Sequence, residues 1–183
     1  QGVSSAASDV YKRQAYEGGD GAVEKHDALE EYANFLRELV PVPARRTLTV
    51  AVDAANGMAG MTVPAVLGDM DVRPLYFELD GTFPNHEANP LDPKNLVDLQ
   101  RFTQEQGADI GLAFDGDADR CFVVDEKGQA VSPSAITALI ATRTLQQEPG
   151  ATIIHNLITS QAVPEIVEEL GGTAVRTRVG HSY

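Results

Sequence analysis

The chain has 183 residues, with 14 Lys and Arg against 27 Asp and Glu, so its formal net charge is −13. A hydrophobic share of 43% with 22% charged residues predicts a folded globular protein rather than a disordered one. The acid excess argues against nucleic acids and anionic membrane surfaces as partners, because Lys and Arg make those contacts. No apolar run approaches the roughly 20 residues of a membrane-spanning helix, and the single cysteine, Cys121, excludes an intrachain disulfide. We therefore expect a cytoplasmic protein.

The two ends of the sequence suggest that it is a piece of a longer protein. Residues 1–14 begin with Gln and show neither helical nor strand periodicity, so we interpret them as a non-native leader. The Gly-rich, acidic residues 15–25 are interpreted as a linker. The last strand-like run, TAVRTRV, has no capping element behind it, as expected for a domain that is cut short.

Helical and strand-like patterns alternate along the rest of the chain. Leu29, Tyr32, Leu36 and Leu39 recur at helical spacing and predict one amphipathic face. Short β-branched runs predict strands, and the segments between them predict helices. The expected strands are 48–52, 72–79, 108–114, 121–125, 151–157 and 173–179, and the expected helices are 26–39, 61–68, 92–107, 132–147 and 159–170.

This alternation predicts an α/β fold with a mixed, largely parallel sheet flanked by helices. Residues 26–130 contain enough elements for one complete domain. Residues 131–183 contain a helix, a strand, a helix and a strand, which predicts the start of a second, truncated domain of the same type. Within the first domain, residues 80–93 have the sequence DGTFPNHEANPLDP. Their three prolines predict a long ordered loop.

Three aspartates alternate in the loop FDGDADR, which follows a buried strand. In an extended segment, Asp115, Asp117 and Asp119 point the same way, and such carboxylates repel one another unless a cation neutralises them. Oxygen ligands favour Mg²⁺ over zinc or copper. Arg120 carries a planar guanidinium suited to phosphate oxygens. The loop therefore predicts a site that handles phosphate with a metal ion.

Four alternatives compete with this interpretation. The first is a solvated acidic turn. The second is an EF-hand, with acids at positions one, three and five and Glu126 at twelve, although Arg120 stands where that loop needs glycine. The third is an aspartate-nucleophile phosphatase, in which Asp115 would be the nucleophile and Asp119 would replace the usual Thr or Val. A non-catalytic metal-binding module also remains open.

Four motifs in order resemble the α-D-phosphohexomutases. They are VDAANGMAG, DGTFPNHEANPLDPKNL, GLAFDGDADRCFVVDEKG and VRTRVGHSY, and within the family they look most like bacterial phosphomannomutases. The resemblance implies the second domain and the start of the third domain of a four-domain enzyme. That enzyme would move phosphate between the 1- and 6-hydroxyls of a hexose through a phosphoserine and a bisphosphate intermediate, with a hexose bisphosphate as activator.

The resemblance also assigns roles to residues. Asp115, Asp117 and Asp119 match the Mg²⁺ ligands, Arg120 matches the arginine beside the phosphoserine, and His181 matches a histidine that lines the substrate cleft. No serine of this chain lies in a T-A-S-H-N-P-type loop, so the phosphoserine is missing and we expect the chain alone to be inactive. The sugar-recognition loop is missing too, which leaves phosphoglucomutase and phosphoglucosamine mutase as alternatives.

Other residues have open roles at this point. His86, in the proline-rich loop, could reach the cleft or brace its own loop through a hydrogen bond. His155 and Asn156 follow a strand at the end where ligands of α/β proteins gather. Cys121 begins a predicted buried strand and is expected in the core.

Overall fold

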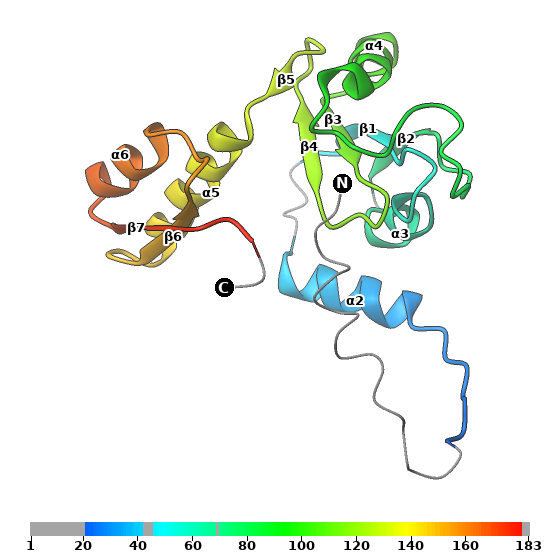
Figure 1. Cartoon of the computed structure of the whole chain (residues 1–183), viewed down its shortest axis with the longest axis horizontal. Helices are drawn as coiled ribbons and strands as arrows, with labels where there is room; N and C mark the ends of the chain where they lie inside the picture. Colours follow the sequence, from blue (N-terminus) through cyan, green and yellow to red (C-terminus); the bar gives the residue numbers. More distant parts are fainter. Residues whose placement is uncertain (1–20, 42–45, 69, 181–183) are drawn as a thin grey trace.

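The computed structural model describes residues 21–41, 46–68 and 70–180. These residues form a five-stranded sheet and, later in the chain, a two-stranded sheet, each with its own helices (Figure 1). The leader predicted at residues 1–14 lies outside the described residues, and the linker predicted at 15–25 lies only partly within them. Within the described ranges, no helix has the length and apolar character needed to cross a bilayer.

The larger sheet has the strand order β2-β1-β3-β4-β5. Its strands are β1 (Thr49–Asp53), β2 (Asp71–Leu75), β3 (Ile110–Phe114), β4 (Cys121–Val124) and β5 (Ala130–Val131). β1 is parallel to both β2 and β3, whereas β4 and β5 form antiparallel pairs. The α/β class and the mixed sheet flanked by helices are therefore confirmed.

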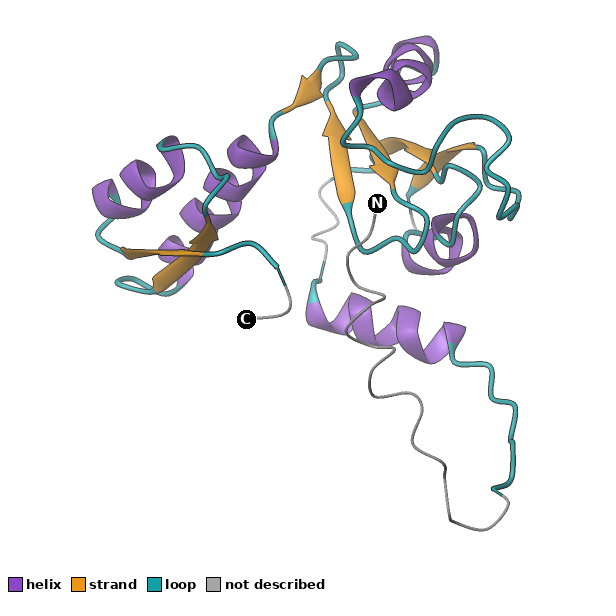
Figure 2. Cartoon of the chain, in the orientation of Figure 1, coloured by secondary structure: helices purple, strands orange, loops and turns teal. Residues whose placement is uncertain are grey.

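Alternation along the central strand β1 divides the core between two faces. Val50 and Val52 lie in one cluster with Val63 of α3 (Ala59–Val66). Ala51 faces the other way and packs with Leu99 of α4 (Val97–Glu105), which is fully buried. α3 and α4 thus cover opposite faces of the sheet (Figure 2). A short 3₁₀ helix, η1 (Pro93–Leu96), precedes α4, and the Asp92 carboxylate caps it by accepting a hydrogen bond from the Lys94 amide.

Two expectations about apolar residues differ from the structure. Helix α2 (Leu29–Leu39) forms as predicted and contacts α3, but Ala33 is its one buried side chain, and Tyr32 and Leu39 are 48% and 62% exposed. Cys121 is exposed, so its placement in the core was wrong. The helical cover of β4 reaches Phe122 and Val124 but not the first residue of the strand.

The second unit follows the predicted order of elements. It comprises α5 (Pro133–Gln147), β6 (Thr152–Asn156), α6 (Ala162–Glu169) and β7 (Thr173–Thr177). β6 and β7 are parallel, as expected for strands joined through a helix. Its small core gathers Ala141, Leu145 and Val167 from the two helices, with Ile153 and Ala174 from one face of the strands.

The turn after β1 lies directly against the loop between β3 and β4. The Met58 amide donates a hydrogen bond of 3.0 Å to the Gly116 carbonyl. A Cβ atom on Gly57 would lie 2.6 Å from that carbonyl oxygen and 2.9 Å from the Gly116 Cα. Only glycine allows the two backbones to meet this closely. Ala55 and Asn56 support the turn with φ angles of 46° and 57°.

We predict that Gly57→Ala will lower the free energy of unfolding by about 1–3 kcal/mol, because the new methyl group overlaps backbone that cannot rotate away. Urea denaturation will measure the change. Gly81→Ala is the matched control, since nothing lies within 4 Å of a Cβ at that position. Equal transition midpoints for the two variants would contradict the role of the close contact.

Candidate metal centre

The acidic loop joins two antiparallel strands by a tight reversal. β3 ends at Phe114 and β4 begins at Cys121. The Asp115 amide donates to the Arg120 carbonyl at 3.3 Å, and the Ala118 amide donates to the Asp115 carbonyl at 3.1 Å. Ala118 adopts a φ of 62°, which is uncommon outside glycine and marks the point of reversal. The loop therefore stands at the carboxyl end of a central strand, where ligand sites of α/β sheets form.

The loop brings together the three carboxylates that the sequence singled out. Asp115, Asp117 and Asp119 each offer one oxygen atom, and these oxygens all lie within 4.8 Å of one another. Asp115 is buried, whereas Asp117 and Asp119 are exposed. Such proximity of negative charges is unfavourable unless a cation compensates it. Three oxygen donors on one side of a short loop match the ligand chemistry of a hard divalent ion.

Arg120 supplies part of that compensation. Its amide donates to Oδ1 of Asp115 at 3.1 Å, and its Nε donates to Oδ2 at 2.6 Å. Asp119 also lies near the guanidinium, with 3.4 Å between its Oδ1 and Nε of Arg120. The side chain of Asp115 is 1% exposed and that of Arg120 is 53% exposed, so the cation covers a buried carboxylate from the solvent side.

The ionisation of Asp115 reflects two opposing effects. Burial is the largest single influence and favours the neutral acid, but it is outweighed by the hydrogen bonds and the charge of Arg120 together with a contact to Asp119. The pKa of Asp115 is therefore held below its ordinary value. A carboxyl group whose pKa is lower in the folded chain than in the unfolded chain stabilises the fold at pH values above its unfolded-state pKa. This stabilisation is lost as the pH falls through the lower, folded-state pKa.

The proline-rich loop backs the acidic loop on one side. A Cβ built on Gly116 would lie 3.3 Å from Cζ of Phe83 and 3.7 Å from Cβ of Ala88. Phe83 has a φ of 51°, so its backbone is held in an uncommon conformation to present this ring. Three segments that are distant in sequence therefore meet at Gly116: the turn after β1, the proline-rich loop and the acidic loop itself.

Two supporting residues were not recognised from the sequence. Asn56 donates through Nδ2 to the Glu78 carbonyl at 2.8 Å and accepts from Nδ2 of Asn85 at 2.8 Å. Asp53, which is 1% exposed, accepts a hydrogen bond from the Ala55 amide at 2.8 Å and lies 2.9 Å from Nε2 of His86. An amide and a carboxylate at the end of a buried strand are the one signal that could have indicated these roles.

The histidines and the asparagine whose roles were left open have mostly local partners. Nε2 of His86 lies 2.9 Å from Oδ2 of Asp53, a contact that fits the bracing role expected for it. Oδ1 of Asn156 accepts from the Ile158 amide and the Thr159 hydroxyl, so this side chain shapes its own turn. Nδ1 of His155 lies 3.2 Å from the Asn156 carbonyl. His181 lies outside the described residues.

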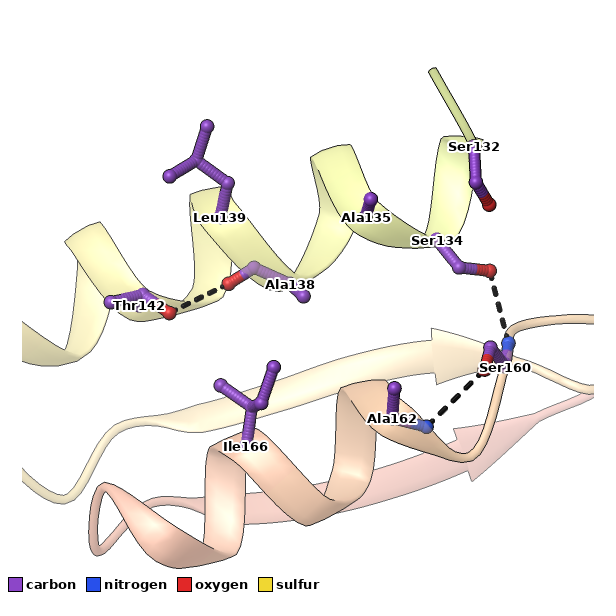
Figure 3. A pocket seen from close by; sticks show the side chains of 9 residues that line it. All are labelled: Ser132, Ser134, Ala135, Ala138, Leu139, Thr142, Ser160, Ala162 and Ile166. Atoms are coloured by element: carbon purple, nitrogen blue, oxygen red, sulfur yellow. Dashed lines mark hydrogen bonds between the residues drawn. The ribbon is translucent and has the colours of Figure 1, made fainter. Parts of the chain in front are cut away.

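A groove of about 480 Å³ runs between α5 and α6 (Figure 3). Three serines, Ser132, Ser134 and Ser160, stand at one end of it, and small or apolar side chains line the rest. Ser134 Oγ accepts from the Ser160 amide at 3.0 Å, and Ser160 Oγ accepts from the Ala162 amide at 3.3 Å. Ser134 thus joins the start of α5 to the start of α6, and Ser160 supports the first turn of its own helix, so both hydroxyl oxygens have structural roles.

The geometry argues against an EF-hand. Two strands flank the acidic loop, and Glu126 lies beyond the far end of the four-residue strand β4, about 13 Å along the chain from its start. It also argues against a nucleophilic Asp115. Attack on a phosphorus atom needs an open approach to the carboxylate, but Asp115 is almost fully buried and both of its oxygens accept hydrogen bonds from Arg120. A metal ion needs only one remaining lone pair on one of these oxygens, so the same arrangement is compatible with a ligand role.

Comparisons with known proteins agree along the described chain. Residues 30–128 match the family described as phosphoglucomutase/phosphomannomutase, alpha/beta/alpha domain II, and residues 132–183 match alpha/beta/alpha domain III of the same family. The phosphomannomutase/phosphoglucomutase of Pseudomonas putida is 41% identical over 164 residues, which cover 88% of this chain and 35% of that protein. A phosphoglucomutase of Neisseria meningitidis is 37% identical over 166 residues, covering 89% of this chain and 35% of that protein.

A solved structure gives the same result. The crystal structure of a phosphoglucomutase/phosphomannomutase family protein from Burkholderia thailandensis superimposes with a TM-score of 0.85 at 34% identity. The alignment covers 91% of this chain and 36% of that structure. The chain thus spans about a third of the length of these relatives.

We predict that Arg120→Gln will lower the free energy of unfolding by about 1–3 kcal/mol near neutral pH, because it leaves the buried Asp115 carboxylate without its cation. Arg101→Gln is the control, since Arg101 is 63% exposed and pairs with Asp98 at the surface, where such pairs contribute about 0–1 kcal/mol. Denaturation at several pH values will show the cost of Arg120→Gln shrinking as Asp115 becomes protonated. A cost that does not change with pH would contradict the charge pairing.

Proposed function

Because the chain belongs to the phosphoglucomutase/phosphomannomutase family, we propose that it is the metal-binding part of a phosphohexomutase. The enzyme would move a phosphoryl group between the 1- and 6-hydroxyls of a hexose. The observation that carries this proposal is the convergence of three carboxylate oxygens within 4.8 Å, beside Arg120, at the end of β3. We propose residues 26–130 as the metal-binding domain and residues 131–183 as part of the following domain.

Asp115, Asp117 and Asp119 would hold the ion, and their all-oxygen donor set fits Mg²⁺. When bound, Mg²⁺ neutralises negative charge on a phosphoryl group and on its neighbouring oxygens. The hydrogen bonds from Arg120 keep Asp115 ionised and hold its carboxylate in place, so that the ligand set is formed before the ion arrives.

Arg120 would also contact the phosphate. Its Nε is engaged by Asp115, and its two terminal nitrogens make no hydrogen bond to any other part of the chain that the structure describes. A guanidinium with free donors next to a metal site binds phosphate oxygens in pairs. Phosphoryl transfer needs little more from a protein than positioning and charge neutralisation. We propose that His181 lines the sugar side of the site, and that a phosphoserine outside this chain supplies the phosphoryl group.

The sugar is proposed to be mannose phosphate, with a hexose bisphosphate as activator and a cytoplasmic location. Glucose phosphate is the second candidate, because relatives of comparable identity carry the names phosphomannomutase/phosphoglucomutase and phosphoglucomutase. Both sugars present the same phosphate group to the acidic loop and to Arg120. The choice between them would therefore depend on residues other than the metal ligands.

We predict that Asp117→Asn will weaken the binding of Mg²⁺ or Mn²⁺ at least about tenfold, measured by calorimetric titration, because it removes one of three ligands. Glu126→Gln is the matched control: it removes the same charge on the same hairpin, and it would remove the twelfth-position ligand of an EF-hand. Equal affinity for Asp117→Asn and wild type, or a larger loss for Glu126→Gln, would contradict the proposed site.

We predict that the 183-residue chain with Mg²⁺ will not convert mannose 6-phosphate or glucose 6-phosphate to the 1-phosphate, because no serine of the chain occupies a phosphoserine context. Phosphorus NMR of the incubated mixture will test this. Hydrolysis of an aryl phosphate that is lost in Asp115→Asn would instead support the aspartate-nucleophile phosphatase and contradict the mutase.

A further inference from the structure

A histidine and a buried aspartate form an ion pair beside the acidic loop. Asp53 ends β1, and in the parallel pairing with β3 it stands opposite Ala113, two residues before Asp115. Nε2 of His86 lies 2.9 Å from Oδ2 of Asp53. The side chain of Asp53 is 1% exposed and that of His86 is 14% exposed, so water screens the pair little.

The hydrogen bonds of His86 require a charged imidazole. Nε2 faces a carboxylate, and Nδ1 lies 2.9 Å from the backbone carbonyl of Glu87. A backbone carbonyl and an ionised carboxylate are both acceptors, so the form that satisfies both contacts is the imidazolium, in which both ring nitrogens donate. In agreement, the hydrogen bond to Asp53 raises the pKa of His86 above its ordinary value, against an opposing effect of burial.

The charged and titratable groups that face His86 come from three elements. They are Asp53 from β1, Tyr76 after β2 and Asp98 from α4. The Tyr76 ring meets the imidazole edge to face, with 5.5 Å between centroids, and its hydroxyl donates to Oδ2 of Asp98 at 2.9 Å. Asp98 is itself paired with Arg101. This surrounding is acidic and favours the imidazolium.

In its loop, His86 lies between Phe83 and Ala88, two residues whose side chains come close to Gly116 of the acidic loop. Phe83 precedes it by three positions and Ala88 follows it by two, and both approach Gly116. The Gly116 carbonyl, in turn, accepts the hydrogen bond from the Met58 amide. Movement of the loop at His86 would therefore change the packing on the residue that separates Asp115 from Asp117.

We propose that His86, held as an imidazolium by Asp53, is a positioning residue that keeps the acidic loop in its metal-binding shape. The inference rests on the proposed function, because the shape of the acidic loop matters only if the loop binds a metal ion. Loss of the proton removes one of the two donors, so the loop loosens as the pH rises through the pKa of His86. Positioning and simple electrostatics then predict opposite results. Removing a nearby positive charge would strengthen cation binding by Coulomb attraction, whereas removing a positioning residue weakens it.

The first test uses the metal-free chain in the presence of a chelator. Amide hydrogen exchange at Met58 reports whether the turn and the acidic loop stay together, after correction for the intrinsic exchange rate. We expect the protection of this amide to fall about tenfold between about pH 5.5 and about pH 8.5 in wild type. In His86→Gln we expect low protection at both pH values. His26→Gln is the matched control, because His26 also faces a carboxylate, that of Glu31, but at an exposed site.

The second test is titration with Mn²⁺ at the lower pH. We expect His86→Gln to bind about fivefold to tenfold more weakly than wild type and His26→Gln to bind normally. Equal or tighter binding by His86→Gln, or a protection of Met58 in wild type that does not change with pH, would overturn the proposal. Failure of the metal site is distinguishable, because it would leave Asp117→Asn and wild type equal in Mn²⁺ binding while the Met58 protection still followed the protonation of His86.

Discussion

The contact between the backbones of Gly57 and Gly116 is the constraint on which the candidate site depends. The two residues follow different strands, β1 and β3, and no side chain can be inserted between them. The hydrogen bond from the Met58 amide to the Gly116 carbonyl closes the contact. Because Gly116 separates Asp115 from Asp117, the position of the first turn sets the position of both carboxylates. A metal site made of three adjacent acids needs such an external support, because the acids repel one another in the absence of an ion.

Two buried carboxylates lie near this contact, and each is paired with a cationic side chain. Asp115 and Asp53 are both nearly inaccessible, and each has one cationic partner, Arg120 or His86. A buried carboxylate without such a partner is costly, so each pair holds a loop in place as well as neutralising a charge. The pKa of Asp115 is lowered beside Arg120, so this carboxylate ionises at a lower pH than an ordinary aspartate, whereas His86 is charged only below its raised pKa. Although the whole chain has a net charge of −13, two buried carboxylates at one edge of the sheet are each paired with a cationic side chain.

The sequence predicted local features well and distant contacts poorly. The order of helices and strands and the alternation of Asp115, Asp117 and Asp119 follow from short-range periodicity, and the structure has both. The pairing of Asp53 with His86 joins residues 33 positions apart, and no spacing rule indicates it. The prediction that Cys121 is buried was wrong for a related reason. A strand pattern predicts burial along a whole strand, but packing decides where the covering helix ends. The exposed Tyr32 and Leu39 on α2 show the same limit of periodicity.

Direct observation of a bound ion would show whether the acidic loop is held in a shape that binds a divalent cation. Crystals of the chain grown with Mn²⁺ would give an anomalous difference map that locates the metal without any assumption about its ligands. We expect one strong peak within bonding distance, about 2.0–2.3 Å, of oxygens from Asp115, Asp117 and Asp119. A map with no peak at the loop, or with its strongest peak at Glu126 instead, would show that these three carboxylates do not form the metal site.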